Sequence, residues 1–239
     1  MTTELANQQA GSLMNPVKEQ RGFESGVDQE DLIIPRAKLI QALSPEMQEG
    51  IEGVKVGTII NSLTKEILPN EFIPIFSFKN YIRFNPRSKD DPNFDADFEP
   101  GAIIWRSNDV SDPHVLEQTK FGANGEKPLA VTFLNFFSYF PGLAMPVIVS
   151  FSKTSYRTGK QLLSLGKFCG GDMFSRKYKL ASHMETNDVG TYAVLKVAPA
   201  GDASAEEFAI CERLWNDFAN KAKDIQVHVE DSNEEERPY

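Results

Sequence analysis

Runs of β-branched and aromatic residues dominate the middle of the chain and predict strands. The clearest runs, separated by turn-forming residues, cover residues 54–60, 72–78, 81–84, 102–106, 129–140 and 145–151. Two further runs, at 174–180 and 191–197, flank a connection that includes a turn at 187–190. The pattern therefore predicts a chain built mainly from strands.

Two segments have helical periodicity instead. The first begins at Thr154 or Ser155 and runs to about Phe168, with its leucines facing inward: Leu162, Leu163 and Leu165. The second covers about 204–223 and opens with a capping box, Ser204-Ala205-Glu206-Glu207. Its apolar stripe predicts core positions for five side chains: Phe208, Cys211, Leu214, Trp215 and Phe218.

Five or more strands with one helix between them and a second helix near the C-terminus predict a β-rich α+β fold. We expect an OB-like β-barrel with added helices, including the C-terminal amphipathic helix, although other β-rich α+β folds fit the same pattern. Residues 1–31 are polar and predict a flexible arm. Residues 32–223 form one predicted OB-like domain, and residues 224–239 form a predicted flexible acidic tail.

The composition limits the cellular compartments in which the protein is expected. A hydrophobic content of 41% is enough for a core, and two cysteines are too few for a disulfide framework. No stretch approaches the roughly 18 apolar residues of a membrane span, and the N-terminus lacks the apolar segment of a signal peptide. We therefore expect a cytoplasmic protein with no membrane partner.

Charge is sorted along the chain. The net charge is −9, but residues 1–31 carry −4 and residues 201–239 carry −7, so residues 32–200 sum to +2. Residues 151–180 alone hold seven Lys or Arg and one acid. A near-neutral body with one basic segment can bind phosphates despite acidic termini, because salt screens charges beyond about 8 Å.

Aromatic residues are interleaved with this basic segment, and the combination predicts a surface for single-stranded nucleic acid. The candidates are Lys153, Tyr156, Arg157, Lys160, Lys167, Arg176, Lys177, Tyr178 and Lys179. A second cluster has the same composition: Lys79, Tyr81, Arg83 and Arg87. The alternative interpretation of both is a solvated basic face.

Further aromatic candidates lie at strand ends. Trp105 and Arg106 form one pair, for which surface and core are equally good interpretations. The aromatic run at 131–140 is typical of core, but Tyr139 and Phe140 precede Pro141-Gly142 and are the members that we expect to be exposed.

Catalytic chemistry has little support in the sequence. The acidic loop at 90–99 resembles a calcium loop but lacks the required Gly and Glu, and the three histidines are scattered. A Ser164-to-Lys167 spacing occurs without its companion motifs, and no phosphate-binding loop is present. We predict a protein that is not an enzyme and that has no cofactor, metal site or catalytic residue.

Three passages resemble proteins encoded by tailed bacteriophages, some of which are taken to be single-stranded DNA-binding proteins. They are the segment 34–45, the segment 150–155 with Gly159-Lys160, and the segment 187–192. The overall plan is also similar to phage replication proteins that coat single strands on an OB fold and contact replication enzymes through an acidic tail ending near an aromatic residue. The matching tail residues are Glu230, Asp231, Glu234, Glu235, Glu236 and Tyr239, although Arg237-Pro238 interrupts the acidic run.

The sequence therefore predicts a phage single-stranded DNA-binding protein for replication or recombination, with weak sequence preference. Its partners would be single-stranded DNA, replication or recombination enzymes that contact the tail, and a second copy if an open strand edge supports a homodimer. One alternative is a phage assembly or interaction protein without nucleic-acid binding. Another is a nucleic-acid-processing enzyme that uses metal-bound carboxylates.

Overall fold

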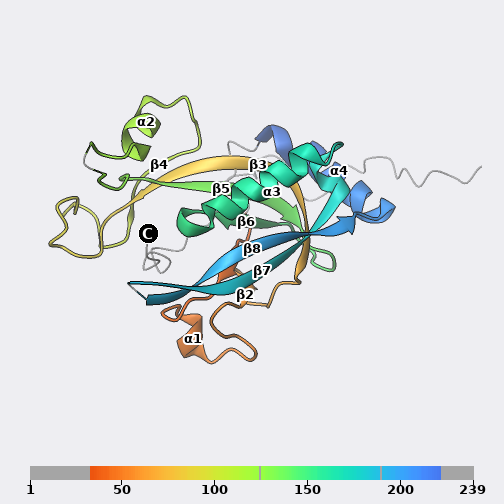
Figure 1. Ribbon diagram of the computed structural model, residues 1–239, viewed down its shortest axis with the longest axis horizontal. Coiled ribbons are helices and arrows are strands. Elements are labelled where there is room, and N and C mark those ends of the chain that lie inside the picture. The colour runs from red at the N-terminus through yellow and green to blue at the C-terminus, as the bar shows by residue number, and fades with distance from the viewer. Residues whose placement is uncertain (1–32, 124, 189, 222–239) are drawn as a thin grey trace, which may run out of the picture.

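One long strand organises the structure. The computed structural model describes residues 33–123, 125–188 and 190–221, so the predicted arm and tail lie outside the described residues. β3 (Glu71–Phe84) pairs with β5 (Val131–Tyr139) on one side, and on the other with β7 (Arg176–Asn187) near its start and β4 (Ile103–Ser107) near its end. With β6 (Val147–Phe151) and β8 (Gly190–Asp202) these strands form a six-stranded antiparallel sheet, in which the order β6-β5-β3-β7-β8 carries β4 as a branch (Figure 1).

β3 merges two segments that the sequence pattern separates. Lys79 and Asn80 remain in the strand because they pair with Leu134 and Phe133 of β5. The proline inside the strand, Pro74, lies at a shift in register against β5. A proline has no N–H to donate, so a bulge is where a strand tolerates it.

A small second sheet lies between the two outer strands of the large one. It pairs β1 (Ala37–Leu39) with β2 (Ile59–Asn61), and α1 (Glu46–Glu49) lies in their connection. At one end the amide of Ile148 in β6 donates to the Pro35 carbonyl at 2.8 Å. At the other, the Gln41 side chain exchanges two 2.9 Å hydrogen bonds with the backbone of Ala193 in β8.

Residues 35–41 thus connect β6 to β8, mainly through individual hydrogen bonds and not through a continuous strand ladder. The described strands do not close into a continuous hydrogen-bonded barrel. The β-rich α+β class is confirmed, and the OB-like barrel stays a prediction.

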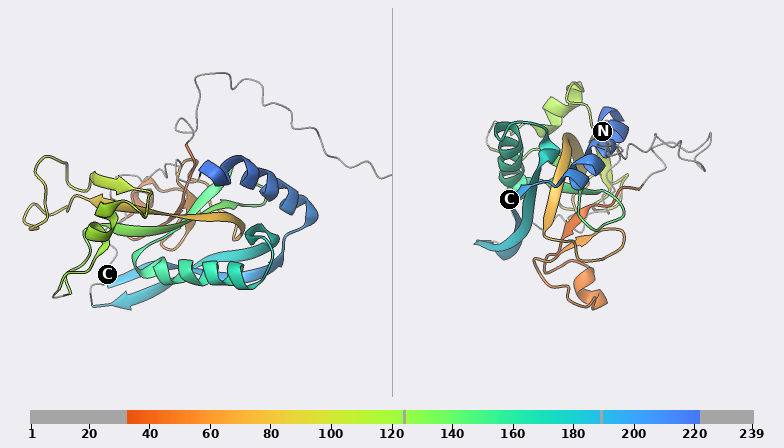
Figure 2. Two further views of the ribbon diagram at one scale, coloured as in Figure 1. Left: turned by 90° about the horizontal axis from the view of Figure 1, so that it is seen from above. Right: turned by 90° about the vertical axis from the view of Figure 1, so that its right-hand side faces the viewer.

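Two long helices cover opposite faces of the sheet (Figure 2). α3 (Tyr156–Phe168), entered through a 3-10 turn at Lys153–Ser155, packs Leu162 into the larger core cluster. α4 (Ala205–Phe218) begins with the predicted capping box, in which Ser204 and Glu207 satisfy each other's backbone amides. Further 3-10 turns lie at Met173–Ser175 and Ala219–Lys221.

A helix that the sequence pattern does not reveal lies in the β4–β5 connection. α2 (Pro113–Thr119) starts at Asp112, whose carboxylate accepts a hydrogen bond from the amide of His114. Asp at the cap and Pro at the first helical position form a recognised start signal. Its apolar pattern is too short to reveal a helix by periodicity. None of the described helices is long and apolar enough to cross a membrane.

The core has two parts, one on each face. Under α3 lie Phe72, Phe136 and Phe151 with the inner residues of the β7–β8 hairpin. Under α4, the Phe137 ring lies 4.8 Å from that of Phe76 and 5.2 Å from that of Phe218, measured between centroids.

Two inward positions predicted for the helices are wrong. Trp215 is 44% exposed and Leu163 is 36% exposed. On α4, Cys211 with Leu214 and Phe218 makes the contact with the smaller core cluster, which leaves Trp215 at the margin of the stripe. On α3, Leu162 takes the corresponding inward place, and Leu163 lies one residue around the helix.

Candidate functional site

The outer face of α3 carries a row of exposed cations. Arg157, Lys160 and Lys167 are all exposed, and their spacing places them on one side of the helix over about 15 Å. The 13-residue helix contains no Asp or Glu. Phe168 ends the helix with 86% of its surface exposed. The predicted basic face is therefore present, with an exposed aromatic residue at its end.

The start of this face is less open. Tyr156 is half-buried, and the Lys160 ammonium lies 5.7 Å from the centroid of its ring, a cation–π contact. Lys153 is half-buried in the 3-10 turn, with a left-handed backbone at φ 48°. The α3 face is defined here by Arg157, Lys160, Lys167 and Phe168, and Lys153 and Tyr156 border it.

Predicted site residues on β7 lie in different environments. Lys179 is exposed, while the guanidinium of Arg176 pairs with Asp202 and the ammonium of Lys177 lies 3.4 Å from Glu207. Tyr178 points the other way and is 1% exposed, with its ring 6.2 Å from that of Phe72. Burial raises the pKa of its hydroxyl. The prediction that Tyr178 stacks on a base is wrong because the ring fills the core.

The second predicted cluster is partly assembled. Lys79, Tyr81 and Arg83 share one side of β3, and register places Arg83 opposite Trp105 of β4. Lys79 is exposed, Arg83 and Trp105 are half-buried, and Tyr81 is 5% exposed. The structure thus brings Arg83 and Trp105 together and removes Tyr81 from the surface, which corrects its predicted stacking role.

The remaining predicted residues are dispersed. Arg87 is exposed in the loop after β3, and Arg106 is exposed opposite Ile82, on the other side of β4 from Trp105. Tyr139 is half-buried. Phe140 is fully buried, with its ring stacked on Phe72 at 5.6 Å, so its predicted exposure is wrong. The predicted tail residues 230–239 lie outside the described residues.

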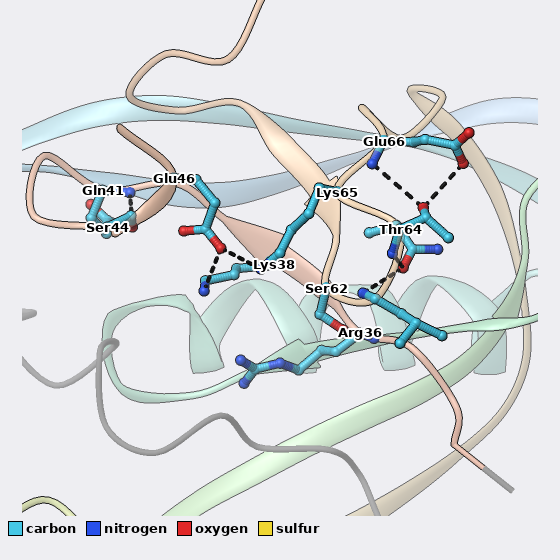
Figure 3. Close-up of polar contacts among 11 residues, drawn as sticks. Arg36, Lys38, Gln41, Ser44, Glu46, Ser62, Thr64, Lys65 and Glu66 are labelled. Carbon is cyan, nitrogen blue, oxygen red and sulfur yellow. Dashed lines mark hydrogen bonds and ion pairs between the residues drawn. The ribbon is translucent and has the colours of Figure 1, made fainter. Parts of the chain in front are cut away.

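Sequence reasoning missed a charged cluster at β1, which consists of the buried Lys38 and Glu46 with the half-buried Lys65 (Figure 3). Arg36, which is also buried, lies two residues before Lys38. The ammonium groups of Lys38 and Lys65 each lie 2.8 Å from the same oxygen of Glu46, Oε1. Lys38 and Glu46 are 2% and 1% exposed, and Lys65 is 34% exposed. Two cations thus hold one buried carboxylate.

This geometry fixes the charge of Glu46. Burial raises the pKa of its carboxyl, but the hydrogen bonds from Lys38 and Lys65 outweigh that effect and lower the pKa from 4.5 to about 2. The signal in the sequence is the alternation of Arg36 and Lys38 with Ala37 and Leu39. Cations at every second position of a strand resemble a solvated face, and the sequence does not show that Glu46 lies beneath them.

Arg36 lies at a junction of three segments. Its backbone amide donates to the Ser62 hydroxyl at 2.9 Å, and it bridges to Ile148 of β6 in a parallel register. Beside it is a small recess lined in part by Phe133, Ser150 and Ser152.

A buried polar chain crosses the sheet to this recess. The Ser150 hydroxyl donates to the Asn135 carbonyl oxygen, and the Asn135 amide donates to the side chain of Asn80, both at 2.7 Å. Three neighbouring strands, β6, β5 and β3, thus each contribute one polar side chain to a fixed chain that ends at Ser150.

Comparison with known protein families places the chain in a phage family. A family model described as "Pam3 phage gp34-like protein" matches residues 5–224, most of the chain. The chain belongs to the Pam3 phage gp34-like family. The comparisons with curated proteins and with solved structures give no match.

Membership in the Pam3 phage gp34-like family supports a bacteriophage protein, as the resemblance in the sequence predicts. It specifies no biochemical activity. Among the described residues, no three His, Cys, Asp or Glu side chains gather in a way that could hold a metal ion. The α3 face, which combines exposed cations with an exposed ring, is therefore the surface from which a function can be argued.

Proposed function

We propose that this Pam3 phage gp34-like protein binds single-stranded nucleic acid through the α3 face, as a non-enzymatic DNA-binding protein in phage replication or recombination. The observation that carries the proposal is a 13-residue helix with three exposed cations and no carboxylate, in a chain whose net charge is −9. Charge concentrated in this way against the overall charge favours a polyanionic partner.

The physical basis is counterion release with base stacking. Arg157, Lys160 and Lys167 span about 15 Å, enough to contact two or three successive phosphates of an extended strand. Phe168 at the end of the row offers a ring for one base, and such contacts contribute about 1–3 kcal/mol each. Phosphate and ring contacts do not distinguish bases, so we expect weak sequence preference.

A second contact region and the scaffold fit the same proposal. Lys79, Arg83 and Trp105 offer cations beside an aromatic ring on β3 and β4. We propose an OB-like, incompletely closed barrel as the scaffold, supported by the bridge that residues 35–41 make between β6 and β8. The acidic tail as a contact for replication enzymes and the homodimer both stay predictions.

The test compares two charge-matched triple variants. Fluorescence anisotropy of a labelled poly-dT oligonucleotide is measured at about 50 and 200 mM salt for the wild type and for Arg157→Gln, Lys160→Gln and Lys167→Gln combined. We expect the variant to lose roughly tenfold or more in affinity at low salt, and the slope of log K against log salt to fall by about 2.

The matched control removes three exposed lysines elsewhere: Lys55→Gln, Lys89→Gln and Lys120→Gln combined. It changes the net charge by the same amount, so equal losses in both variants would mean that overall charge, and not the α3 face, drives binding. Absence of wild-type binding at low salt would overturn the proposal.

A protein-interaction role is the second candidate, and one observation favours it. The β4–β5 connection exposes large apolar side chains: Val110 at 68%, Leu116 at 74% and Phe121 at 66%. Exposed apolar residues close together in a chain are typical of a protein contact. If the oligonucleotide does not bind at low salt, this assembly role becomes the better interpretation, and Leu116→Ser with Phe121→Ser would be the variant with which to examine it.

A further inference from the structure

We propose that the α3 face and two cations of β3 form one continuous track that holds a single strand of about six nucleotides, with an aromatic ring at each end. Phe168 ends the track on α3, and Trp105 of β4 ends it on the sheet. The inference rests on the proposed binding of single strands and adds to it the path and the length of the bound strand.

The register of the strands places Lys79 on the side of the sheet that α3 covers. Lys79 pairs with Leu134 of β5, and Leu134 pairs with Phe151 of β6. Residues directly opposite each other in antiparallel strands point to the same face, and Leu134 and Phe151 belong to the core cluster into which α3 packs. The side chain of Lys79 therefore leaves the sheet on the same side as α3, two strands away from β6.

The track continues from the start of α3 along β3. Gly159, near the start of the helix, lies against Phe151, which is level with Lys79 in the register. Arg83 follows four residues after Lys79 and shares its face, because side chains alternate along a strand. Trp105 is directly opposite Arg83, so its ring lies on the same face. β3 thus carries the track past the start of α3 toward β4 (Figure 1).

The cations of β3 are available to a ligand. Lys79 is exposed and Arg83 is half-buried, and neither side chain forms an ion pair or a hydrogen bond within the described part of the chain. α3, β4, β5 and β6 contain no Asp or Glu. The one acid of β3, Glu71, precedes Phe72, which packs under α3, so Glu71 points to the opposite face. Cations presented together without a carboxylate favour a polyanion.

The dimensions of the track set the length of the strand. The cations of α3 span about 15 Å, and Lys79 and Arg83 are about 13 Å apart along β3. Two strand spacings, about 10 Å, separate Lys79 from Phe151 beneath the start of α3. The track is therefore about 38 Å long. A single strand extended to about twice the 3.4 Å phosphate spacing of a stacked strand covers it with about six nucleotides.

The experiment uses the full chain and labelled oligo-dT strands of four and eight nucleotides, followed by anisotropy at about 50 mM salt. We expect Lys79→Gln with Arg83→Gln to bind the eight-nucleotide strand about tenfold more weakly than the wild type does. The four-nucleotide strand should change by less than about threefold, because it contacts only one segment of the track at a time. Lys55→Gln with Lys89→Gln removes the same charge from exposed positions and is the matched control, which should bind both strands within about twofold of the wild type.

Tryptophan fluorescence tests the end of the track without changing a cation. The chain has two tryptophans, Trp105 on the track and Trp215 on α4, which covers the opposite face of the sheet. In Trp215→Phe, we expect the eight-nucleotide strand to quench the remaining emission by about a third or more, because a base stacks on the indole of Trp105. In Trp105→Phe, the emission should change by less than about a tenth, because the strand does not reach Trp215.

The track is overturned if Lys79→Gln with Arg83→Gln, shown to be folded by circular dichroism, binds the eight-nucleotide strand as the wild type or the control variant does. It is also overturned if that variant loses affinity equally for both lengths, or if Trp105 is not quenched. The proposed function fails separately. If the α3 triple variant weakens binding and the β3 pair does not, the α3 face binds strands without the track, whereas absence of wild-type binding overturns both.

Discussion

Glu46 is the residue whose ionisation most directly links stability to pH. Its pKa is about 2 in the folded protein against 4.5 for an unperturbed carboxyl. A lowered pKa stabilises the fold above pH 4.5, and that contribution, about 3 kcal/mol at neutral pH, is lost as the pH falls toward 2. We expect the free energy of unfolding of the wild type to decline over this interval by about 3 kcal/mol more than that of Glu46→Gln.

The measurement is urea unfolding at a series of pH values from about 2 to 7. At pH 7, Glu46→Gln should be less stable than the wild type by about 3–5 kcal/mol, because it leaves two lysines without their buried carboxylate. Glu66→Gln is the control, since Glu66 is exposed and its carboxylate accepts a hydrogen bond from the Thr64 hydroxyl in the same turn. Parallel pH curves for the wild type and Glu46→Gln would contradict the assigned ionisation.

The two cysteine thiols should differ in reactivity because one is buried and the other is exposed. Burial raises the pKa of Cys211 to about 12, whereas Cys169 is exposed at the end of α3. Because the thiolate is the reactive form, a thiol reagent at pH 8 should modify one cysteine per native chain and two after denaturation. Peptide mapping checks that the first is Cys169, and rapid native modification of Cys211 would contradict its burial.

Two aromatic residues show that the burial of a side chain cannot be read from its neighbours in the sequence. Tyr178 and Phe140 stand beside cations or a turn, the usual context of an exposed ring, yet both pack against Phe72 in the core. The inward direction of Tyr178 depends on the pairing of β3 with β7, a contact across about 100 residues of chain, and that of Phe140 on the pairing of β3 with β5.

At the scale of elements, α3 depends on a close contact at one glycine. A Cβ at Gly159 would lie 2.7 Å from the Cβ of Phe151 on β6, which is closer than two carbon atoms can pack. Gly159→Ala should therefore lift the helix from the sheet and destabilise the fold by about 1–3 kcal/mol despite the better helix propensity of alanine. Thermal and urea unfolding measure the loss.

Gly166 provides a matched control on the same helix. There a Cβ would meet the flexible end of Met173 at 3.0 Å, and that side chain can move aside. We expect Gly166→Ala to be neutral or to stabilise the protein by up to about 1 kcal/mol, from helix propensity alone. If Gly159→Ala were as well tolerated as Gly166→Ala, the close packing of α3 on β6 would be wrong.

Most elements could be predicted from local patterns, and the exceptions have identifiable physical causes. The strands other than the short β1 correspond to predicted runs, and the capping box marks the start of α4 correctly. α2 was missed because seven residues are too few to establish a period. β3 was split at Lys79-Asn80 because continuity there comes from pairing with β5, and pairing is not a local property.

At the scale of the whole molecule, the order of the strands and the attachment of the small sheet could not be read from the sequence. Nothing local indicates that β3 pairs with β4, β5 and β7, or that Gln41 and Pro35 connect the small sheet to β8 and β6. The charged cluster around Glu46 is assembled by the same long-range folding and was missed with it. Charge distribution, by contrast, is a sum over residues and could be read directly.

That distribution supports a last prediction about the complete chain. Residues 224–239 contain six acids and one base, so they repel a polyanion that approaches the more basic body. Replacing their five acids from 230 to 236 with the matching amides should tighten binding to poly-dT at about 50 mM salt, chiefly through a faster association rate. At about 200 mM salt the gain should shrink, because screening shortens the reach of the acids.

Stopped-flow anisotropy separates the association and dissociation rate constants, and the same substitutions within the α3 triple variant provide the control. A gain that persists at high salt and appears mainly in the dissociation rate would point instead to a tail that occupies the binding surface directly.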